Sequence, residues 1–310
     1  MRLLLGVMWL LHWLPMPVLG RLGQGLGLML FVLAKSRRHI ALTNLRLCFP
    51  VMPQAERNAL AKRHFQAYGR SVVEHGLLWW ASEKRLSKLI VVKSPMPLSA
   101  VESQAVIYLC PHFVSLDVAG VALARLTSGC AIYARQSNAT LDRALHKGRS
   151  RFHPVALFSR SDGIKPIVRA MRKGLPFFMC PDMDFGNKDA AFVPFFGVAA
   201  ATLTAPTRLA GLTGAKIVPV TAKHLPDYRG WLVEFHPAWQ HGAEPDDEKS
   251  ALHMNRFIEQ QVLKTPAEYL WTHRRFKTRP VGQPDVYARD GAYTTVMPAG
   301  PGSAAQTAKP

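Results

Sequence analysis

The stretch Cys110-Pro-His-Phe-Val-Ser-Leu-Asp117 follows the apolar run Ala105-Val-Ile-Tyr-Leu109, and together they decide how the chain folds. Because the run is continuously apolar rather than alternating, it predicts a strand buried on both faces. The segment 118–125 that comes next predicts a helix, with polar residues suited to its first turn. His112 should therefore lie at the carboxyl end of a strand, where open α/β sheets bind their ligands.

His112 and Asp117 are five residues apart, which would place them about 140° apart on a continuous helix. A contact between them therefore needs a turn, which could fold the carboxylate back onto one imidazole nitrogen. In such a pair the carboxylate fixes the tautomer, and the other nitrogen can take a proton from a hydroxyl. The alternative is a strand-end histidine followed by an ordinary N-cap aspartate, and the spacing alone leaves both open.

Composition points to an acidic partner. The 310 residues carry a formal net charge of +19, which favours nucleic acid, an anionic membrane surface or an acidic carrier protein. Nucleic acid is disfavoured because the basic residues are scattered and no nucleic-acid-binding motif is present. The four cysteines have no short paired spacing, which predicts neither a zinc site nor a disulfide framework and fits a reducing compartment.

The N-terminal segment 1–34 is expected to anchor the chain to a membrane. Residues 3–20 carry no charge, a second apolar run covers 22–34, and a basic cluster follows at 35–38. Eighteen residues just reach the length of a span, but the prolines and tryptophans also fit an interfacial segment, so the form of attachment stays open. The basic cluster places the rest of the chain on the cytoplasmic side.

Apolar and helical patterns alternate over residues 100–236. This predicts an α/β fold with a central, mostly parallel mixed sheet flanked by helices. Strands are expected at 105–109, 130–134, 176–180, 216–220 and 231–235, and helices at 118–125, 140–151, 163–173, 204–212 and 248–263. Residues 35–280 would form the catalytic domain. Residues 281–310 are rich in Gly, Ala and Pro and predict a flexible C-terminal tail.

Several motifs occur in a fixed order: His112 with Asp117, an Arg-ended strand at Arg135, the loop Pro181-Asp-Met-Asp184 and a Val-Pro-Val strand. This set resembles the glycerolipid acyltransferase superfamily with its H-x4-D motif. More closely, the chain resembles the bacterial late acyltransferases of lipid A biosynthesis, the lauroyl/myristoyl type, over about residues 1 to 280. The narrower resemblance rests on Asn44-Leu-Arg-Leu-Cys-Phe-Pro50, Pro181-Asp-Met-Asp184, Phe192-Val-Pro-Phe-Phe-Gly197 with Thr202, and Tyr269-Leu-Trp-Thr-His-Arg-Arg-Phe-Lys277. Met183 departs from the amide common in that loop.

The resemblance implies transfer of a fatty acyl chain from acyl carrier protein to a hydroxyl of a lipid A precursor, at the cytoplasmic face of the inner membrane. His112 would be the general base, oriented by Asp117. No metal or redox cofactor is implied, since the thioester is already activated. An oxyanion formed in the reaction would need hydrogen-bond donors.

Five further residues are candidates for substrate binding. Arg135 matches the family's second block and would bind phosphate or the carrier, or else is a solvated strand-end charge. Asp182 and Asp184 would hold acceptor hydroxyls or position basic residues, or else cap a turn. Arg160 and Arg169 flank the helix that leads into that loop and could hold anionic groups. Ser115 lacks the G-x-S-x-G context of a serine nucleophile.

Three other functions remain open on the sequence. The same chemistry could act on another membrane lipid, such as a lysophospholipid, an aminolipid or a glycolipid, because the motifs encode acyl transfer rather than the acceptor. A hydrolase would use His112 and Asp117 on water. A non-catalytic basic protein would bind membrane or carrier without needing either residue.

Overall fold

The structure is a computed structural model that describes residues 1–95, 105–239 and 246–288, apart from the side chain of Arg160. Its α-helices are α1 (Arg2–Leu11), α2 (Met16–Leu33), α3 (Lys35–Cys48), α4 (Gln54–Trp80), α5 (Glu83–Leu89), α6 (Leu116–Ala124), α7 (Ala139–Arg149), α8 (Lys165–Arg172), α9 (Ala205–Thr213) and α10 (Asp247–Lys264). Its strands are β1 (Ile90–Lys93), β2 (Val106–Leu109), β3 (Gly129–Tyr133), β4 (Val155–Ser159), β5 (Phe177–Met179), β6 (Ala190–Phe195), β7 (Val198–Leu203), β8 (Lys216–His224) and β9 (Trp231–Phe235).

A seven-stranded mixed sheet forms the centre of the described part of the chain, in the order β1-β9-β8-β2-β5-β3-β4. All neighbouring strands are parallel except β8 and β9, which form an antiparallel pair. Strand β2 lies in the middle and is buried at every position. A separate antiparallel hairpin, β6–β7, packs against α10. The α/β fold with a mostly parallel mixed sheet is thus confirmed.

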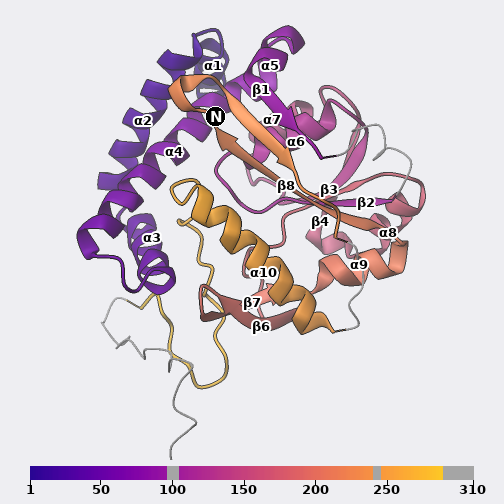
Figure 1. Ribbon diagram of the computed structural model, residues 1–310. Coiled ribbons are helices and arrows are strands. Elements are labelled where there is room, and N and C mark those ends of the chain that lie inside the picture. The colour runs from indigo at the N-terminus through magenta and orange to yellow at the C-terminus, as the bar shows by residue number, and fades with distance from the viewer. Residues whose placement is uncertain (96–104, 240–245, 289–310) are drawn as a thin grey trace, which may run out of the picture.

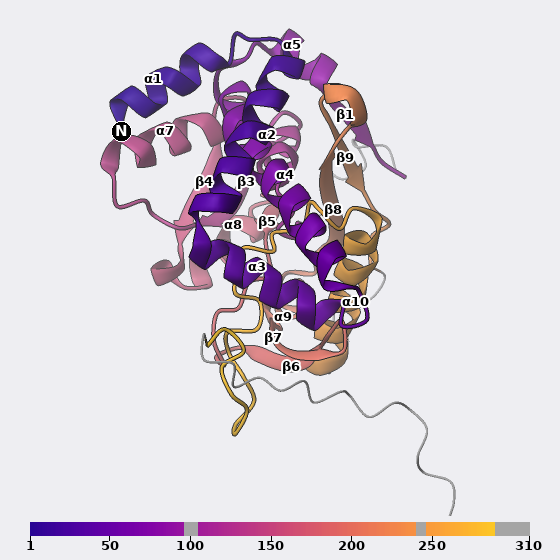
Figure 2. The same ribbon diagram turned by 90° about the vertical axis from the view of Figure 1, so that its left-hand side faces the viewer.

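Two apolar layers cover the two faces of the sheet. One layer joins the sheet to α8, α9, α10 and the N-terminal half of α4, and the other joins it to α6, α2 and the C-terminal half of α4. In Figure 1, α4 lies between the N-terminal helices and the sheet, and Figure 2 shows the same helices from the side that they cover. Helix α4 therefore links the N-terminal segment to the part of the fold that holds the H-x4-D motif.

Helix α2 packs very closely on α4 through glycines. A Cβ atom at Gly27 would collide with the carbonyl oxygen of Phe65, and one at Gly69 would collide with the backbone of Gly23. The other side of α2, and most of α1, leaves large apolar side chains exposed, including Leu3 at 83% and Leu33 at 67%. In the part of the chain that the structure describes, α2 is long and apolar enough to cross a membrane.

The start of the expected C-terminal tail packs against the fold. Val286 and Tyr287 are buried, at 2% and 4% exposure. The Tyr287 hydroxyl donates to Asn44 Oδ1 at 2.6 Å, and the backbone N–H of Phe276 donates to that hydroxyl at 3.0 Å. Burial and these two hydrogen bonds therefore hold Val286 and Tyr287 against the fold, whereas residues 281–285 before them are exposed. Residues 289–310 lie outside the described residues.

Candidate active site

His112 lies three residues after β2, and Asp182 lies three residues after the neighbouring parallel strand β5. The two strands pair Leu109 with Met179, and the Cys110 N–H donates to the Met179 carbonyl at 2.8 Å. Parallel strands in register bring the residues that follow them to the same edge of the sheet. The register therefore places the two loops side by side.

Asp182 holds both the ring and the backbone of His112. Its Oδ1 lies 2.6 Å from His112 Nδ1, and its Oδ2 accepts the His112 backbone N–H at 2.9 Å. The Asp182 side chain is fully buried, whereas the His112 side chain is 16% exposed. The ionised carboxylate only accepts hydrogen bonds, so the contact assigns the proton to Nδ1 and leaves Nε2 with a lone pair.

The Asp182 carboxyl is held in its charged form. Burial raises its pKa, but the neighbouring His112 and its hydrogen bonds, with a smaller contribution from Arg275, lower the pKa to about 2. Opposite charge and donated hydrogen bonds thus outweigh desolvation. A buried carboxylate that stays ionised at neutral pH can stabilise an imidazolium at His112.

Asp117 lies in the first turn of α6, as expected. Its Oδ1 accepts from Arg149 at 3.1 Å, and its Oδ2 lies 3.8 Å from His75 Nδ1. Within the described residues no hydrogen bond joins Asp117 to His112, so the expected contact between them is not formed. The reason is geometric. Asp182, in the loop after β5, occupies the position beside Nδ1, and the chain at Asp117 continues into α6 instead of folding back toward His112.

The electrostatic surroundings of Asp117 differ from those of Asp182. Burial raises the pKa of Asp117, but His75 and Arg149 lower it below its ordinary value. The Asp117 and Arg149 side chains are 42% and 36% exposed. This ion pair is thus partly open to solvent, and a substrate anion could reach Arg149 there.

Asp184 has a structural set of contacts. Its carboxylate accepts from the N–H and the hydroxyl of Thr278, at 2.6 and 2.7 Å, and from the Gly186 N–H at 3.0 Å. The backbone N–H of Asp184 donates to His273 Nε2 at 3.3 Å. Burial lowers the pKa of His273 to about 4. Asp184 therefore ties the loop of Asp182 to the C-terminal segment.

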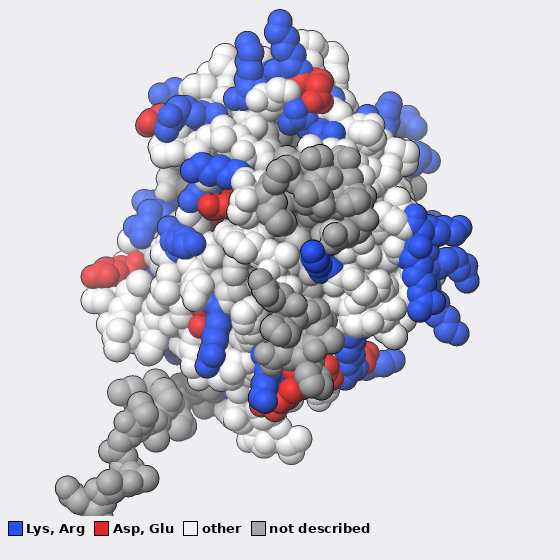
Figure 3. Space-filling view, turned by 45° about the vertical axis from the view of Figure 1, so that its right-hand side comes forward, with Lys and Arg blue, Asp and Glu red and all other residues white. Residues whose placement is uncertain are grey.

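The candidate arginines do not gather around His112. Arg135 is exposed just after β3, and Arg169 is exposed in the last turn of α8. In the described part of the chain neither side chain has a hydrogen bond or ion pair. The side chain of Arg160 lies outside what is described. Figure 3 shows lysine and arginine side chains spread over the face it displays, with fewer acidic ones, so the positive charge is a broad property of that surface.

Sequence reasoning missed Arg149, His75 and His273 as neighbours of this site. Nothing in their spacing marks them, because each comes from a different helix or loop. The Asp182 contact did leave a signal. Leu109-Cys-Pro-His112 and Met179-Cys-Pro-Asp182 have the same pattern of apolar residue, Cys, Pro and polar residue, and neighbouring parallel strands would align them.

The site has no accessible alternative nucleophile among the described residues nearest His112. Ser115 is 2% exposed. Burial raises the pKa of the Cys110 and Cys180 thiols well above their ordinary range, which keeps both protonated. The arrangement therefore fits a general base that acts on a hydroxyl brought by a substrate.

Comparisons with known proteins show the family of the chain. The family model for bacterial lipid A biosynthesis acyltransferases matches residues 1–278. The chain is 34% identical to the lipid A biosynthesis palmitoleoyltransferase of Escherichia coli (strain K12) over 286 residues, 91% of this chain and 92% of the other. It is 33% identical to the lauroyltransferase of the same strain, over 91% and 93% of the two chains, and 30% identical to the myristoyltransferase, over 89% and 85%.

The fold and the family match thus define an α/β acyltransferase with an H-x4-D motif. The chain belongs to the family of bacterial lipid A biosynthesis acyltransferases.

Proposed function

We propose that this protein transfers a fatty acyl chain from the thioester of acyl carrier protein to a free hydroxyl of a lipid A precursor, with His112 as general base. The proposal is carried by the contact between His112 Nδ1 and the buried Asp182 carboxylate at 2.6 Å. That contact leaves Nε2 as the proton acceptor on the more open side of the ring. Family membership supports lipid A as the acceptor.

In the proposed reaction, His112 Nε2 takes the proton of the acceptor hydroxyl while the oxygen of that hydroxyl attacks the thioester carbonyl carbon. The tetrahedral intermediate collapses, the C–S bond breaks, and the carrier thiolate takes the proton back from His112. Asp182 stabilises the imidazolium between these two steps. This role replaces the one expected for Asp117, which would instead fix Arg149 at the edge of the site.

Arg149 is the side chain proposed to bind an anionic part of a substrate, since it is charged, half-exposed and held by Asp117. Arg135, Asp184, Arg160 and Arg169 remain candidates for substrate contacts. Asp184 would act by holding the Asp182 loop, and Arg135 and Arg169 would act as part of the positive surface. A net charge of +19 favours both an acidic carrier protein and a phosphorylated lipid.

The proposal places the enzyme at the inner membrane, with its catalytic domain facing the cytoplasm. Support comes from the apolar α2 and the exposed side chains of α1, followed by Lys35, Arg37 and Arg38 at the start of α3. The region 1–34 would then bring the site close to lipids. The thioester supplies an activated acyl group, so the proposed reaction uses no metal or redox cofactor.

Acceptor and donor profiling tests the proposal. Purified protein in detergent micelles is given acyl carrier protein that is loaded with radiolabelled acyl chains of several lengths. Each donor is tested with a lipid A precursor, with a lysophospholipid or with no acceptor. We expect labelled lipid A precursor, little lysophospholipid product and little free fatty acid. Transfer to lysophospholipid alone would favour the other lipid acceptor, and equal release of fatty acid without acceptor would favour the hydrolase.

A further inference from the structure

Behind the His112 loop lies a buried cluster of charged residues that the proposed reaction does not use. His224, at the end of β8, is 5% exposed in its side chain and lies between two carboxylates. Its Nε2 lies 3.2 Å from Glu74 of α4, and its Nδ1 lies 3.1 Å from Glu268. Arg70 also donates to Glu74, at 2.7 Å, so two cations and two anions balance.

The arrangement favours a charged imidazole, because Nε2 lies 3.2 Å from one carboxylate and Nδ1 lies 3.1 Å from the other. A neutral histidine has one nitrogen that only accepts, and that nitrogen would face a carboxylate oxygen without a proton between them. Only the imidazolium places an N–H on each side. Burial lowers the pKa of His224, but Glu268 and Glu74 outweigh burial and raise the pKa above its ordinary value.

Glu268 connects this cluster to the loop of His112. Its side chain accepts the backbone N–H of His224 at 3.0 Å. The backbone carbonyl of Glu268 accepts the Val114 N–H at 2.8 Å, and the Leu270 N–H donates to the His112 carbonyl at 2.9 Å. Phe113 and Tyr269 between them form an antiparallel bridge. The segment 268–270 is thus a short strand-like partner of residues 112–114.

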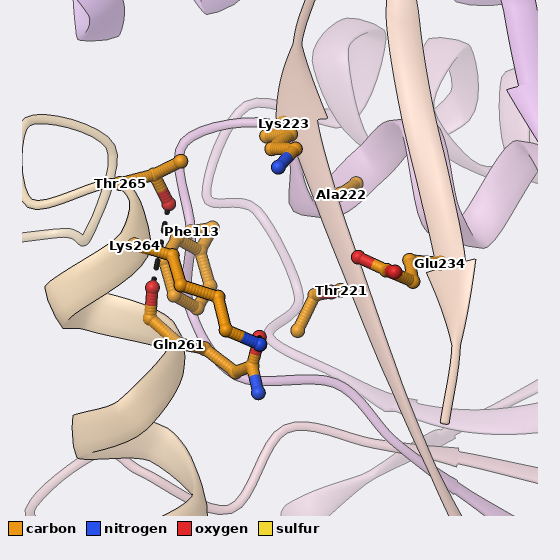
Figure 4. Close-up of a pocket in the computed structure, with 8 residues that line it drawn as sticks. All are labelled: Phe113, Thr221, Ala222, Lys223, Glu234, Gln261, Lys264 and Thr265. Carbon is orange, nitrogen blue, oxygen red and sulfur yellow. Dashed lines mark hydrogen bonds between the residues drawn. The ribbon is translucent and has the colours of Figure 1, made fainter. Parts of the chain in front are cut away.

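Figure 4 shows the surroundings of Phe113, the middle residue of this paired segment. A small pocket lies between the C-terminal end of α10 and strand β8, and Phe113 forms part of its wall. In Figure 4, Phe113 lies beside Lys264 and faces the strand that carries Thr221 and Lys223. Phe113 is itself buried, and its ring packs edge-on against Tyr269. Side-chain packing and backbone pairing therefore both join residues 112–114 to 268–270.

We propose that His224, through its contacts with Glu74 and Glu268, is a positioning residue that fixes the backbone of the His112 loop. The connection runs from α4 to β8, then to Glu268, and through two backbone hydrogen bonds to His112 and Val114. Asp182 holds the loop from the other side. The inference rests on the proposed function, since it assigns these residues a role in placing its general base.

The test compares Glu268→Ala with the matched variant Glu268→Gln. Alanine removes the contact with His224, whereas glutamine keeps an acceptor oxygen of the same reach. We expect Glu268→Ala to lower kcat about 10- to 100-fold with little change in KM for either substrate, because small misplacements of a base have effects of this size. Glu268→Gln should keep kcat within about threefold of wild type, on the same reasoning.

A second variant separates positioning from stability. His224→Met combined with Glu74→Gln removes one cation and one anion, so Arg70 and Glu268 still balance. We expect its Tm to lie closer to wild type than that of His224→Met alone, while kcat stays low. Recovery of kcat together with Tm would overturn the proposal, because the cluster would then be structural only.

Hydrogen exchange gives a readout that is independent of catalysis. The amides of residues 112–116 and 268–272 should exchange faster in Glu268→Ala than in Glu268→Gln. Unchanged exchange, or full kcat in folded Glu268→Ala, would overturn the positioning role. Failure of the proposed function would appear differently. Wild type would then show no acyl transfer, although the amides of residues 112–116 and 268–272 still exchange faster in Glu268→Ala.

Discussion

His112 Nδ1 lies 2.6 Å from Oδ1 of Asp182, a residue 70 positions later in the sequence. The same carboxylate accepts the backbone N–H of His112, so ring and backbone are fixed by one buried group. A single loop after β5 therefore sets the tautomer of the proposed base and the path of the chain that carries it.

Replacing Asp182 by asparagine should lower kcat on the order of 10³-fold with a much smaller effect on KM. The amide can present its N–H to Nδ1 and favour the wrong tautomer, and it supplies no charge for the imidazolium. Steady-state kinetics on folded variant, checked by thermal unfolding, measures this. A loss below about threefold would mean that another group orients His112.

The charge of Asp182 also predicts a pH dependence of stability. Its pKa is about 2 in the folded protein and about 3.9 in an unfolded chain. A lowered pKa stabilises the fold fully above about pH 4, and this stabilisation is lost as the pH falls toward 2. The free energy of unfolding of wild type should therefore fall by roughly 2–3 kcal/mol more than that of Asp182→Asn across this window. Parallel curves would contradict the buried charge.

Asp117 and Arg149 should affect activity more than stability. Both side chains are more than a third exposed, and ion pairs of this kind contribute about 0–1 kcal/mol. Asp117→Asn and Arg149→Met should each lower the rate of acyl transfer about tenfold or more, with a Tm change of a few degrees. The double variant should be little worse than either single one, since both remove the same pair. Additive losses would mean that the two residues act separately.

The contact between α2 and α4 predicts opposite effects for two glycines of one helix. Gly27→Ala should destabilise the protein by a few kcal/mol, because the new Cβ would overlap the Phe65 carbonyl oxygen. Gly25→Ala is the matched control, since nothing lies within 4 Å of its Cβ position, and should be neutral or stabilising by up to about 1 kcal/mol. Thermal unfolding in the same detergent distinguishes them. Equal Tm values would show that α2 is not packed on α4.

The sequence predicted the sheet better than the contacts of the site. The expected strands at 105–109, 130–134, 176–180 and 231–235 all form within a few residues, because buried parallel strands have continuous apolar runs. Strand β8 is longer than expected and extends to His224. Strands β1 and β4 and the β6–β7 hairpin were not predicted, and none of them is buried at every position as β2 is.

The partner of His112 could not be chosen from spacing alone. The H-x4-D pattern drew attention to Asp117 because it is local, whereas Asp182 is brought close only by the order of strands in the sheet. That order places β5 next to β2, although two strands lie between them in the sequence. The identity of the neighbouring strand is a property of the tertiary structure, and so is the pairing of Asp117 with Arg149.

The most direct test of the central claim is acyl transfer from acyl carrier protein to a lipid A precursor by wild type, His112→Ala and His153→Ala. His153 is exposed in the loop before β4 and serves as a matched histidine control. We expect transfer by wild type and His153→Ala, and a loss of roughly 10³-fold or more in His112→Ala. Transfer at the wild-type rate by folded His112→Ala would contradict the assignment of His112 as the general base.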